Sequence, residues 1–75
     1  MELNDFVARF AEQFEDTDPA EITAGTVYKD LDEWSSILAF SVIAMVKTEY
    51  DKTVTGAEIR HCETVEDLFN TIAAK

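Results

Sequence analysis

The 75-residue sequence contains very few of the residues that make turns, cross-links and metal sites. It has two glycines, one proline and one cysteine, Cys62. Because hairpins depend on glycine and proline at their turns, this scarcity favours an all-α fold. A single cysteine cannot form an internal disulfide, and with the only histidine, His61, it falls short of a zinc ligand set. We therefore expect no metal site, and a free cysteine fits a reduced, cytoplasmic location.

The chain is also poor in basic residues and in long apolar runs. Six Lys and Arg stand against 16 Asp and Glu, which gives a formal net charge of −10. This charge repels nucleic acids and anionic membranes, so neither is an expected partner. No apolar run approaches the roughly 18 residues that span a bilayer, so we expect no membrane insertion. The length predicts one domain, residues 1–75, with a small core, and we expect a monomer.

Hydrophobic periodicity predicts a small four-helix bundle with three main helices, one short helix before the last, and a long first loop. The second helix is expected from about Ser36 to Tyr50. Thr55 begins a capping-box pattern that predicts the short helix, and Thr64 begins a looser one that predicts the last helix. The first helix is expected from the spacing of five apolar residues: Leu3, Phe6, Val7, Phe10 and Phe14.

The long first loop covers residues 16–33. Asp18-Pro19-Ala20-Glu21 predicts one helical turn within it, because aspartate caps such a turn and proline suits its first position. A connection of this length without a full helix is usually functional or flexible. Four apolar residues are expected to hold this loop against the core: Ile22, Val27, Tyr28 and Leu31.

The second helix is apolar almost all the way round, since only Ser41 is polar between residues 37 and 46. Helical spacing places one set of residues towards the core: Ala39, Val42, Ile43, Val46 and Tyr50. The opposite side contains Ile37, Ser41, Ala44, Met45 and Thr48. This second set is interpreted either as a docking surface or as a surface covered by the long loop.

Two adjacent serines, Ser35 and Ser36, lie where the acidic loop becomes this helix. No general base is visible beside them, so an attachment point is favoured over a nucleophile. Ser35 is suited to cap the helix by accepting from the N–H of residue 37 or 38. Ser36 would lie in the first turn, whose free N–H groups favour an anion. An unmodified Ser-Ser cap is the other interpretation.

The order of long loop, Asp30-Leu31, tryptophan, serine, apolar helix, short helix and last helix resembles the acyl carrier protein family, including its peptidyl and D-alanyl carrier relatives. The resemblance covers nearly the whole chain. In that family the attachment serine follows an aspartate and precedes a leucine. Ser36 falls on the serine, Ser35 stands in place of the aspartate, and Ile37 stands in place of the leucine.

The resemblance implies a 4′-phosphopantetheine arm joined to Ser36, which would hold an acyl or aminoacyl group as a thioester. The protein would not be an enzyme. Its partners would be a phosphopantetheinyl transferase and the acyl- or aminoacyl-loading and acyl-processing enzymes of pathways such as fatty acid biosynthesis and lipid metabolism. The residues expected to dock these partners are Asp32, Glu33, Ile37, Leu38, Ser41 and Met45.

Two departures from the family narrow this expectation. Ser35 removes the usual aspartate, and the second helix carries only Glu49 as an acid, against Lys47. These departures favour a dedicated carrier of one pathway over a general fatty-acid carrier. The alternative is an unmodified acidic helical adaptor that binds a partner protein through the second helix. Five apolar residues either line an acyl pocket or form ordinary core, and core is favoured: Val42, Val46, Ile59, Leu68 and Ile72.

Overall fold

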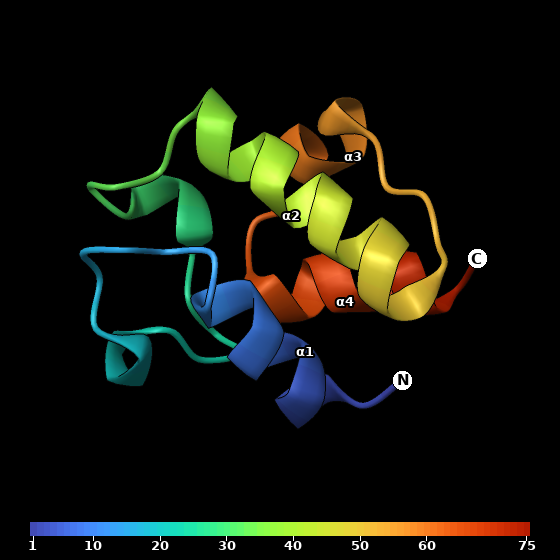
Figure 1. The fold of residues 1–75 in the computed structure, drawn as a ribbon, viewed down its shortest axis with the longest axis horizontal. Helices are drawn as coiled ribbons and strands as arrows, with labels where there is room; N and C mark the ends of the chain where they lie inside the picture. Colours follow the sequence, from blue (N-terminus) through green and yellow to red (C-terminus); the bar gives the residue numbers. More distant parts are fainter.

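Four α-helices and two short 3-10 helices make up the regular structure of the protein, which is described over residues 1–75 by a computed structural model (Figure 1). No strand forms, so the predicted all-α bundle is confirmed. None of the helices has the length and apolar character needed to cross a membrane. In chain order the elements are α1 (Leu3–Ala11), η1 (Pro19–Glu21), η2 (Tyr28–Asp30), α2 (Ser36–Tyr50), α3 (Gly56–His61) and α4 (Val65–Ala73).

Local caps determine where most of these helices begin. The Ser35 hydroxyl accepts from the N–H of Leu38 at 3.4 Å and caps α2, as expected from the sequence. Thr55 with Glu58, and Thr64 with Asp67, form complete capping boxes at α3 and α4. In each box two backbone N–H groups that would otherwise be unpaired are satisfied. The three predicted helix starts are therefore confirmed.

The first helix is shorter than its apolar pattern predicts. It ends at Ala11, and the N–H of Phe14 donates to the Ala11 carbonyl at 3.1 Å in a tight turn. Such 3-10-type bonds commonly close the last turn of a helix. Phe14 is nevertheless buried, so the pattern identified a core residue correctly although the residue lies outside the helix.

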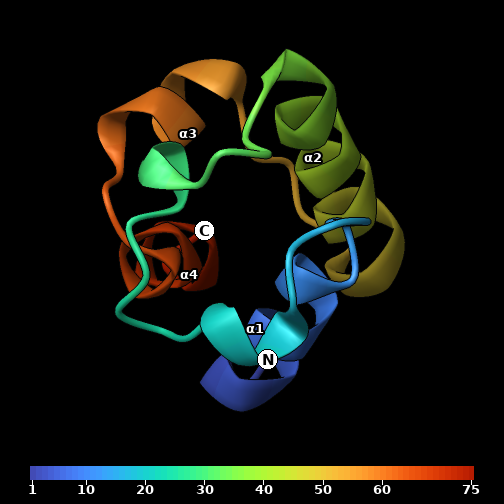
Figure 2. The same ribbon diagram turned by 90° about the vertical axis from the view of Figure 1, so that its left-hand side faces the viewer.

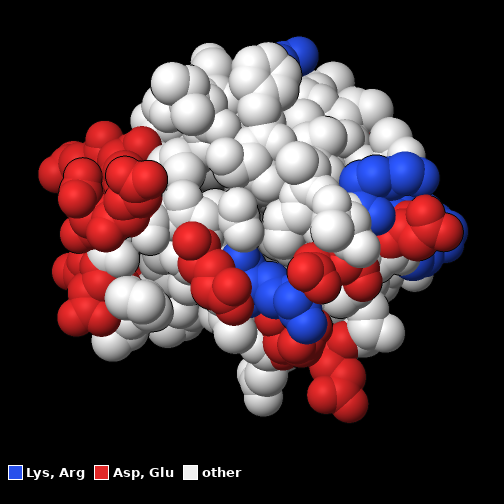
Figure 3. Space-filling model, in the orientation of Figure 1, with Lys and Arg blue, Asp and Glu red and all other residues white.

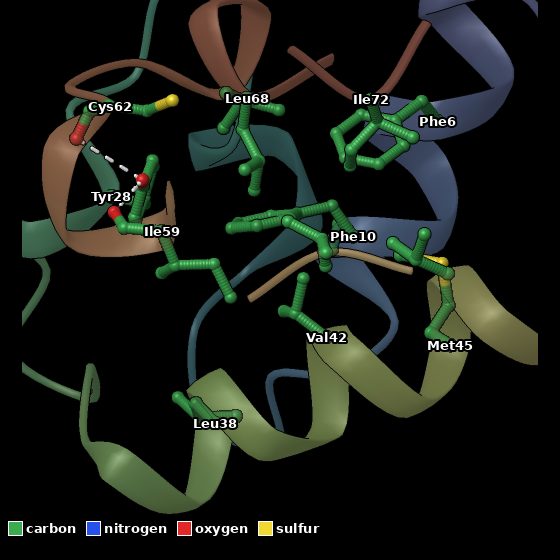
Figure 4. Packing of buried hydrophobic residues seen from close by; sticks show 14 of the residues in the cluster. Phe6, Phe10, Tyr28, Leu38, Val42, Met45, Ile59, Cys62, Leu68 and Ile72 are labelled. Carbon is green, nitrogen blue, oxygen red and sulfur yellow. Dashed lines mark hydrogen bonds between the residues drawn. The ribbon is translucent and has the colours of Figure 1, made fainter. Parts of the chain in front are cut away.

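Aromatic and aliphatic side chains fill the space between the helices, with Phe10 of α1 in the middle (Figure 4). Its ring centroid lies 5.6 Å from that of Tyr28 and 6.2 Å from that of Trp34, which stacks on it at 13°. The Tyr28 hydroxyl donates to the carbonyl oxygens of Ile59 and, at 3.2 Å, Cys62. Burial raises the pKa of Tyr28 above its usual range. The five residues considered for an acyl pocket are all buried in this core.

The long loop runs across one end of the bundle and reaches both α3 and α4 (Figure 2). The predicted turn after Asp18 forms, since its carboxylate accepts from the N–H of Ala20 at 2.9 Å. Ile22 and Tyr28 are buried as expected, and Leu31 is half-buried. The expectation for Val27 is wrong: it is 37% exposed, although its backbone forms an isolated antiparallel bridge with Thr64.

Candidate functional site

The two serines have different environments. Ser35 is used by the fold, because its hydroxyl caps α2. Ser36 is the first residue of α2; its side chain is exposed and takes part in none of the side-chain hydrogen bonds of the protein. The helix therefore needs the hydroxyl of Ser35, whereas the hydroxyl of Ser36 is free for chemistry. The predicted cap is confirmed, and attachment at Ser36 remains a prediction.

Trp34 fixes the position of the serine pair relative to the core. Its backbone N–H donates to the Leu31 carbonyl at 3.0 Å, which closes a turn just before α2. Its ring stacks on Phe10 and Phe14 and meets Tyr28 edge-on at a centroid distance of 4.9 Å. Aromatic pairs in these geometries add to the stability gained from burial. The start of α2 is thus held by packing as well as by its cap.

A cavity of about 330 Å³ lies beside the serines, between the first half of α2, η2 and α3. Ser35 and Ser36 both line it. Phe40, Ile43 and Ile59 form the apolar part of its wall. Its polar boundary includes two cations, Lys29 and Arg60, and no Asp or Glu. Such a volume lies near the lower end of the roughly 300–1,000 Å³ of typical small-molecule sites.

Glu33 has a structural role that the sequence did not indicate. Its carboxylate accepts from the backbone N–H groups of Glu15 at 2.8 Å, Asp16 at 3.1 Å and Thr17 at 2.9 Å. The hydroxyl of Thr17 donates to it as well, at 2.8 Å. Partial burial raises the pKa of this carboxyl, but these hydrogen bonds outweigh burial and leave the pKa below its usual range. Docking of partners by Glu33 stays a prediction, although its carboxylate is already engaged within the protein.

The structure divides the other predicted docking residues. Asp32 and Ile37 are exposed and Ser41 is half-exposed, so all three remain accessible. Leu38 and Met45 are each only 7% exposed, and their assignment to a docking surface is wrong.

Leu38 and Met45 are buried because of the rotation of α2 about its axis. Its buried side is centred on Leu38, Val42, Met45 and Val46, which follow i, i+4, i+7 and i+8 spacing. Because the helix is apolar all round, its pattern alone could not fix that rotation.

Phe40 is the functional candidate that sequence reasoning missed. Its side chain is 70% exposed, and that of Ile37 three residues earlier is 77% exposed. Residues three apart lie on one face of a helix, so the two form an apolar pair next to Ser36. Figure 3 shows an uncharged area over the start of α2, with acidic atoms at its left-hand side. The sequence did contain a signal for this candidate, because Phe40 is a large aromatic residue that belonged to neither predicted side of the helix.

Acidic residues of the long loop surround a second, separate hollow of about 690 Å³. Asp16, Glu21, Asp30 and Asp32 line it, together with the engaged carboxylate of Glu33. No group of three or more His, Cys, Asp or Glu side chains is arranged to hold a metal ion. This region therefore contributes negative potential beside the start of α2.

Comparisons of the chain with family models, with curated proteins and with solved structures find no match. The likeness to acyl carrier proteins consequently depends on the residues quoted above and on the order of the helices.

Proposed function

We propose that the protein is a carrier of the acyl carrier type, with a 4′-phosphopantetheine arm attached to the hydroxyl of Ser36. The observation that supports this most is that the two serines have different roles. Ser35 already caps α2, so the fold has no need of the neighbouring hydroxyl, which is exposed at the first turn. When bound, the arm supplies a thiol that holds an acyl or aminoacyl group as a thioester.

The residues around Ser36 fit a phosphodiester. The first N–H groups of a helix are not used within it, and with the helix dipole they favour an anion by about 0.3–1 kcal/mol when exposed. The cavity beside Ser36 offers two cations and an apolar wall. The hydroxyl points to attachment rather than to catalysis by this chain, since no imidazole or carboxylate is hydrogen-bonded to it. Acyl transfer is therefore assigned to partner enzymes.

The proposed partners are a phosphopantetheinyl transferase and the enzymes that load and process the cargo. Ile37 and Phe40 give them an exposed apolar contact immediately after the attachment residue. Asp32 and the acidic hollow beside it favour a partner with a basic surface, because complementary charge speeds encounter and fixes orientation. We assign the carrier to one dedicated cytoplasmic pathway and expect it to act as a monomer.

A second function is supported by the same exposed pair. An acidic helical adaptor would bind a partner through Ile37 and Phe40 without any covalent group. It would leave Ser36 unmodified, so the two functions differ in one measurable property.

The test is the intact mass of the protein after incubation with coenzyme A and a broad-specificity phosphopantetheinyl transferase. Wild type and Ser35→Ala should each gain one arm, and Ser36→Ala should gain none. Ser35→Ala should also melt earlier, because loss of a serine cap costs about 1 kcal/mol. No addition with several transferases would reject the carrier and favour the adaptor. Addition to Ser36→Ala but not to Ser35→Ala would move the attachment to Ser35.

A further inference from the structure

Arg60 is a cation without a partner in a strongly acidic protein. Of the six Lys and Arg residues, three form ion pairs with carboxylates and two donate to backbone carbonyl groups. Only Arg60 does neither, although the chain contains 16 acids. An exposed guanidinium has five N–H donors, so its full capacity to bind an anion is unused.

The Arg60 side chain lies at the cavity beside Ser36 and next to Gly56, the first residue of α3. A Cβ on Gly56 would be 3.4 Å from Nη1 of Arg60. Gly56 has a negative φ, so its backbone conformation does not require glycine. The guanidinium therefore lies near the first turn of α3, and Arg60 lines the cavity that Ser36 also lines.

Lys29 places a second positive charge at the same cavity. Its ammonium group donates to the Arg60 carbonyl at 2.8 Å, which occupies one of three donors. The next residue of η2, Asp30, lines the separate acidic hollow instead. No carboxylate lines the cavity, so both charges on its wall are positive. An anion bound in the cavity would be attracted to both.

We propose that Lys29 and Arg60 bind the phosphate of the arm on Ser36. This inference rests on the proposed function, since Ser36 must carry the phosphodiester. Guanidinium groups bind phosphate oxygens in a two-pronged geometry, and charge-assisted hydrogen bonds are the stronger ones. The volume of about 330 Å³ accommodates the phosphate and the adjoining part of the arm, with Phe40 and Ile43 as apolar wall.

The test is the phosphorus NMR signal of the phosphopantetheine-loaded protein. In wild type, the signal should be displaced and broadened relative to the same sample unfolded in urea. Arg60→Gln should return it more than half of the way to the unfolded value, and the double variant with Lys29→Gln further. Lys52→Gln is the matched control, because Lys52 also donates to a carbonyl, that of Lys75 at 2.8 Å, yet does not line the cavity. It should leave the signal unchanged.

The outcomes separate this inference from the proposed function. If wild type accepts no arm, the carrier function fails, and the inference fails with it. If the arm is loaded but Arg60→Gln and the double variant give the wild-type signal while circular dichroism shows them folded, only the inference is overturned. Inorganic phosphate titrated into the unloaded protein tests for a general anion site. Saturable phosphate binding that Arg60→Gln abolishes would support these cations as the phosphate site, and phosphate binding that both variants retain would overturn it.

Discussion

The side chains of four consecutive residues, Glu33 to Ser36, differ in their contacts and in their structural roles. Glu33 binds backbone N–H groups of the turn after α1, and Trp34 packs on Phe10. Ser35 caps α2, and Ser36 has no role in the fold. The first three side chains hold the fourth in place, so the position of the candidate attachment hydroxyl depends on contacts from three parts of the chain.

Glu33→Gln should destabilise the protein in a pH-dependent way. At pH 7 we expect the melting temperature to fall by roughly 4–8 °C, because an amide replaces a carboxylate that accepts four hydrogen bonds. Those bonds hold the pKa of Glu33 below its usual range in the folded state. The stabilisation by the Glu33 carboxylate is therefore present when the pH is above the pKa of Glu33 in the unfolded state. It is lost as the pH falls through the lower pKa of Glu33 in the folded state.

Thermal melts of wild type and variant between about pH 7 and pH 3 check this, since glutamate normally titrates near 4.3. The two melting temperatures should converge at the acidic end. Asp32→Asn is the matched control: Asp32 is exposed and forms no side-chain hydrogen bond, so its replacement should change the melting temperature little at any pH. A difference for Glu33→Gln that stays constant over the whole range would contradict the account.

Local signals allowed much of this region to be predicted, and longer-range contacts explain what was missed. The Ser35 cap could be predicted because it joins residues only three apart. The role of Glu33 could not, since its partners lie 16 to 18 residues earlier in the chain. A sequence pattern within one helix or loop cannot identify an acid whose oxygens accept hydrogen bonds from a turn far away in the chain.

At the scale of elements, α2 is the part whose orientation the sequence left open. The caps and the apolar run predicted its ends, and both are confirmed. Its rotation follows from contacts with α1 and α3, which bury Leu38 and Met45 and leave Phe40 exposed. For α4, by contrast, Val65, Leu68 and Ile72 form one apolar stripe against a polar face, so burial could be predicted. An amphipathic helix shows its buried side in its sequence, and a helix that is apolar all round does not.

The exposed pair on α2 should matter for partners and not for stability. Ile37→Ser and Phe40→Ser should each change the free energy of unfolding by no more than about 0.5 kcal/mol, because both side chains are largely in solvent. Together they should lower kcat/KM for arm transfer by the transferase roughly fivefold or more, as expected for loss of an apolar contact at an interface.

Val27→Thr is the control for this prediction, because Val27 is also an exposed apolar residue but lies in the long loop. It should leave arm transfer unchanged. Equal transfer rates for all the variants would show that the pair on α2 is not a docking contact.

The end of α2 is tied to α1 by Tyr50, whose hydroxyl donates to Asp5 at 2.6 Å. Burial, followed by this hydrogen bond, raises the pKa of Tyr50 to about 12. The folded state thus holds the phenol proton more tightly than the unfolded state, where tyrosine titrates near 10. Stability should be complete below about pH 10 and decline as the pH rises towards 12.

Urea unfolding of wild type and Tyr50→Phe between pH 8 and pH 11 measures this contribution. Wild type should lose stability over the upper part of the range more steeply than the variant. Tyr28 also has a raised pKa and is present in both proteins, so some decline should remain in the variant. Identical pH dependence in the two proteins would show that Tyr50 does not titrate as described.

At the scale of the whole molecule, net charge is the dominant feature. The protein carries a net charge of −10 within extents of only 29 × 23 × 20 Å. The Debye length falls from about 30 Å at 0.01 M salt to about 8 Å at 0.15 M, so low salt leaves repulsion across the whole molecule unscreened. The four ion pairs are partly exposed and are expected to contribute little in return.

The melting temperature should therefore rise when sodium chloride is increased from about 0.01 M to 0.15 M, because screening relieves self-repulsion in the compact state. Magnesium chloride at matched ionic strength should have a similar effect, since no carboxylate cluster is arranged to hold a metal ion. A fall in melting temperature with salt, or a saturable extra stabilisation by magnesium, would contradict this description of the charge distribution.

The central claim is that Ser36 carries the arm, and peptide fragmentation after loading tests it most directly. All three serines of the chain, Ser35, Ser36 and Ser41, fall in the single tryptic peptide 30–47 between Lys29 and Lys47. Tandem mass spectrometry of this peptide from loaded wild-type protein should place one 4′-phosphopantetheine on Ser36. An arm located on Ser35 or Ser41, or a peptide that stays unmodified after treatment with several transferases, would contradict the account.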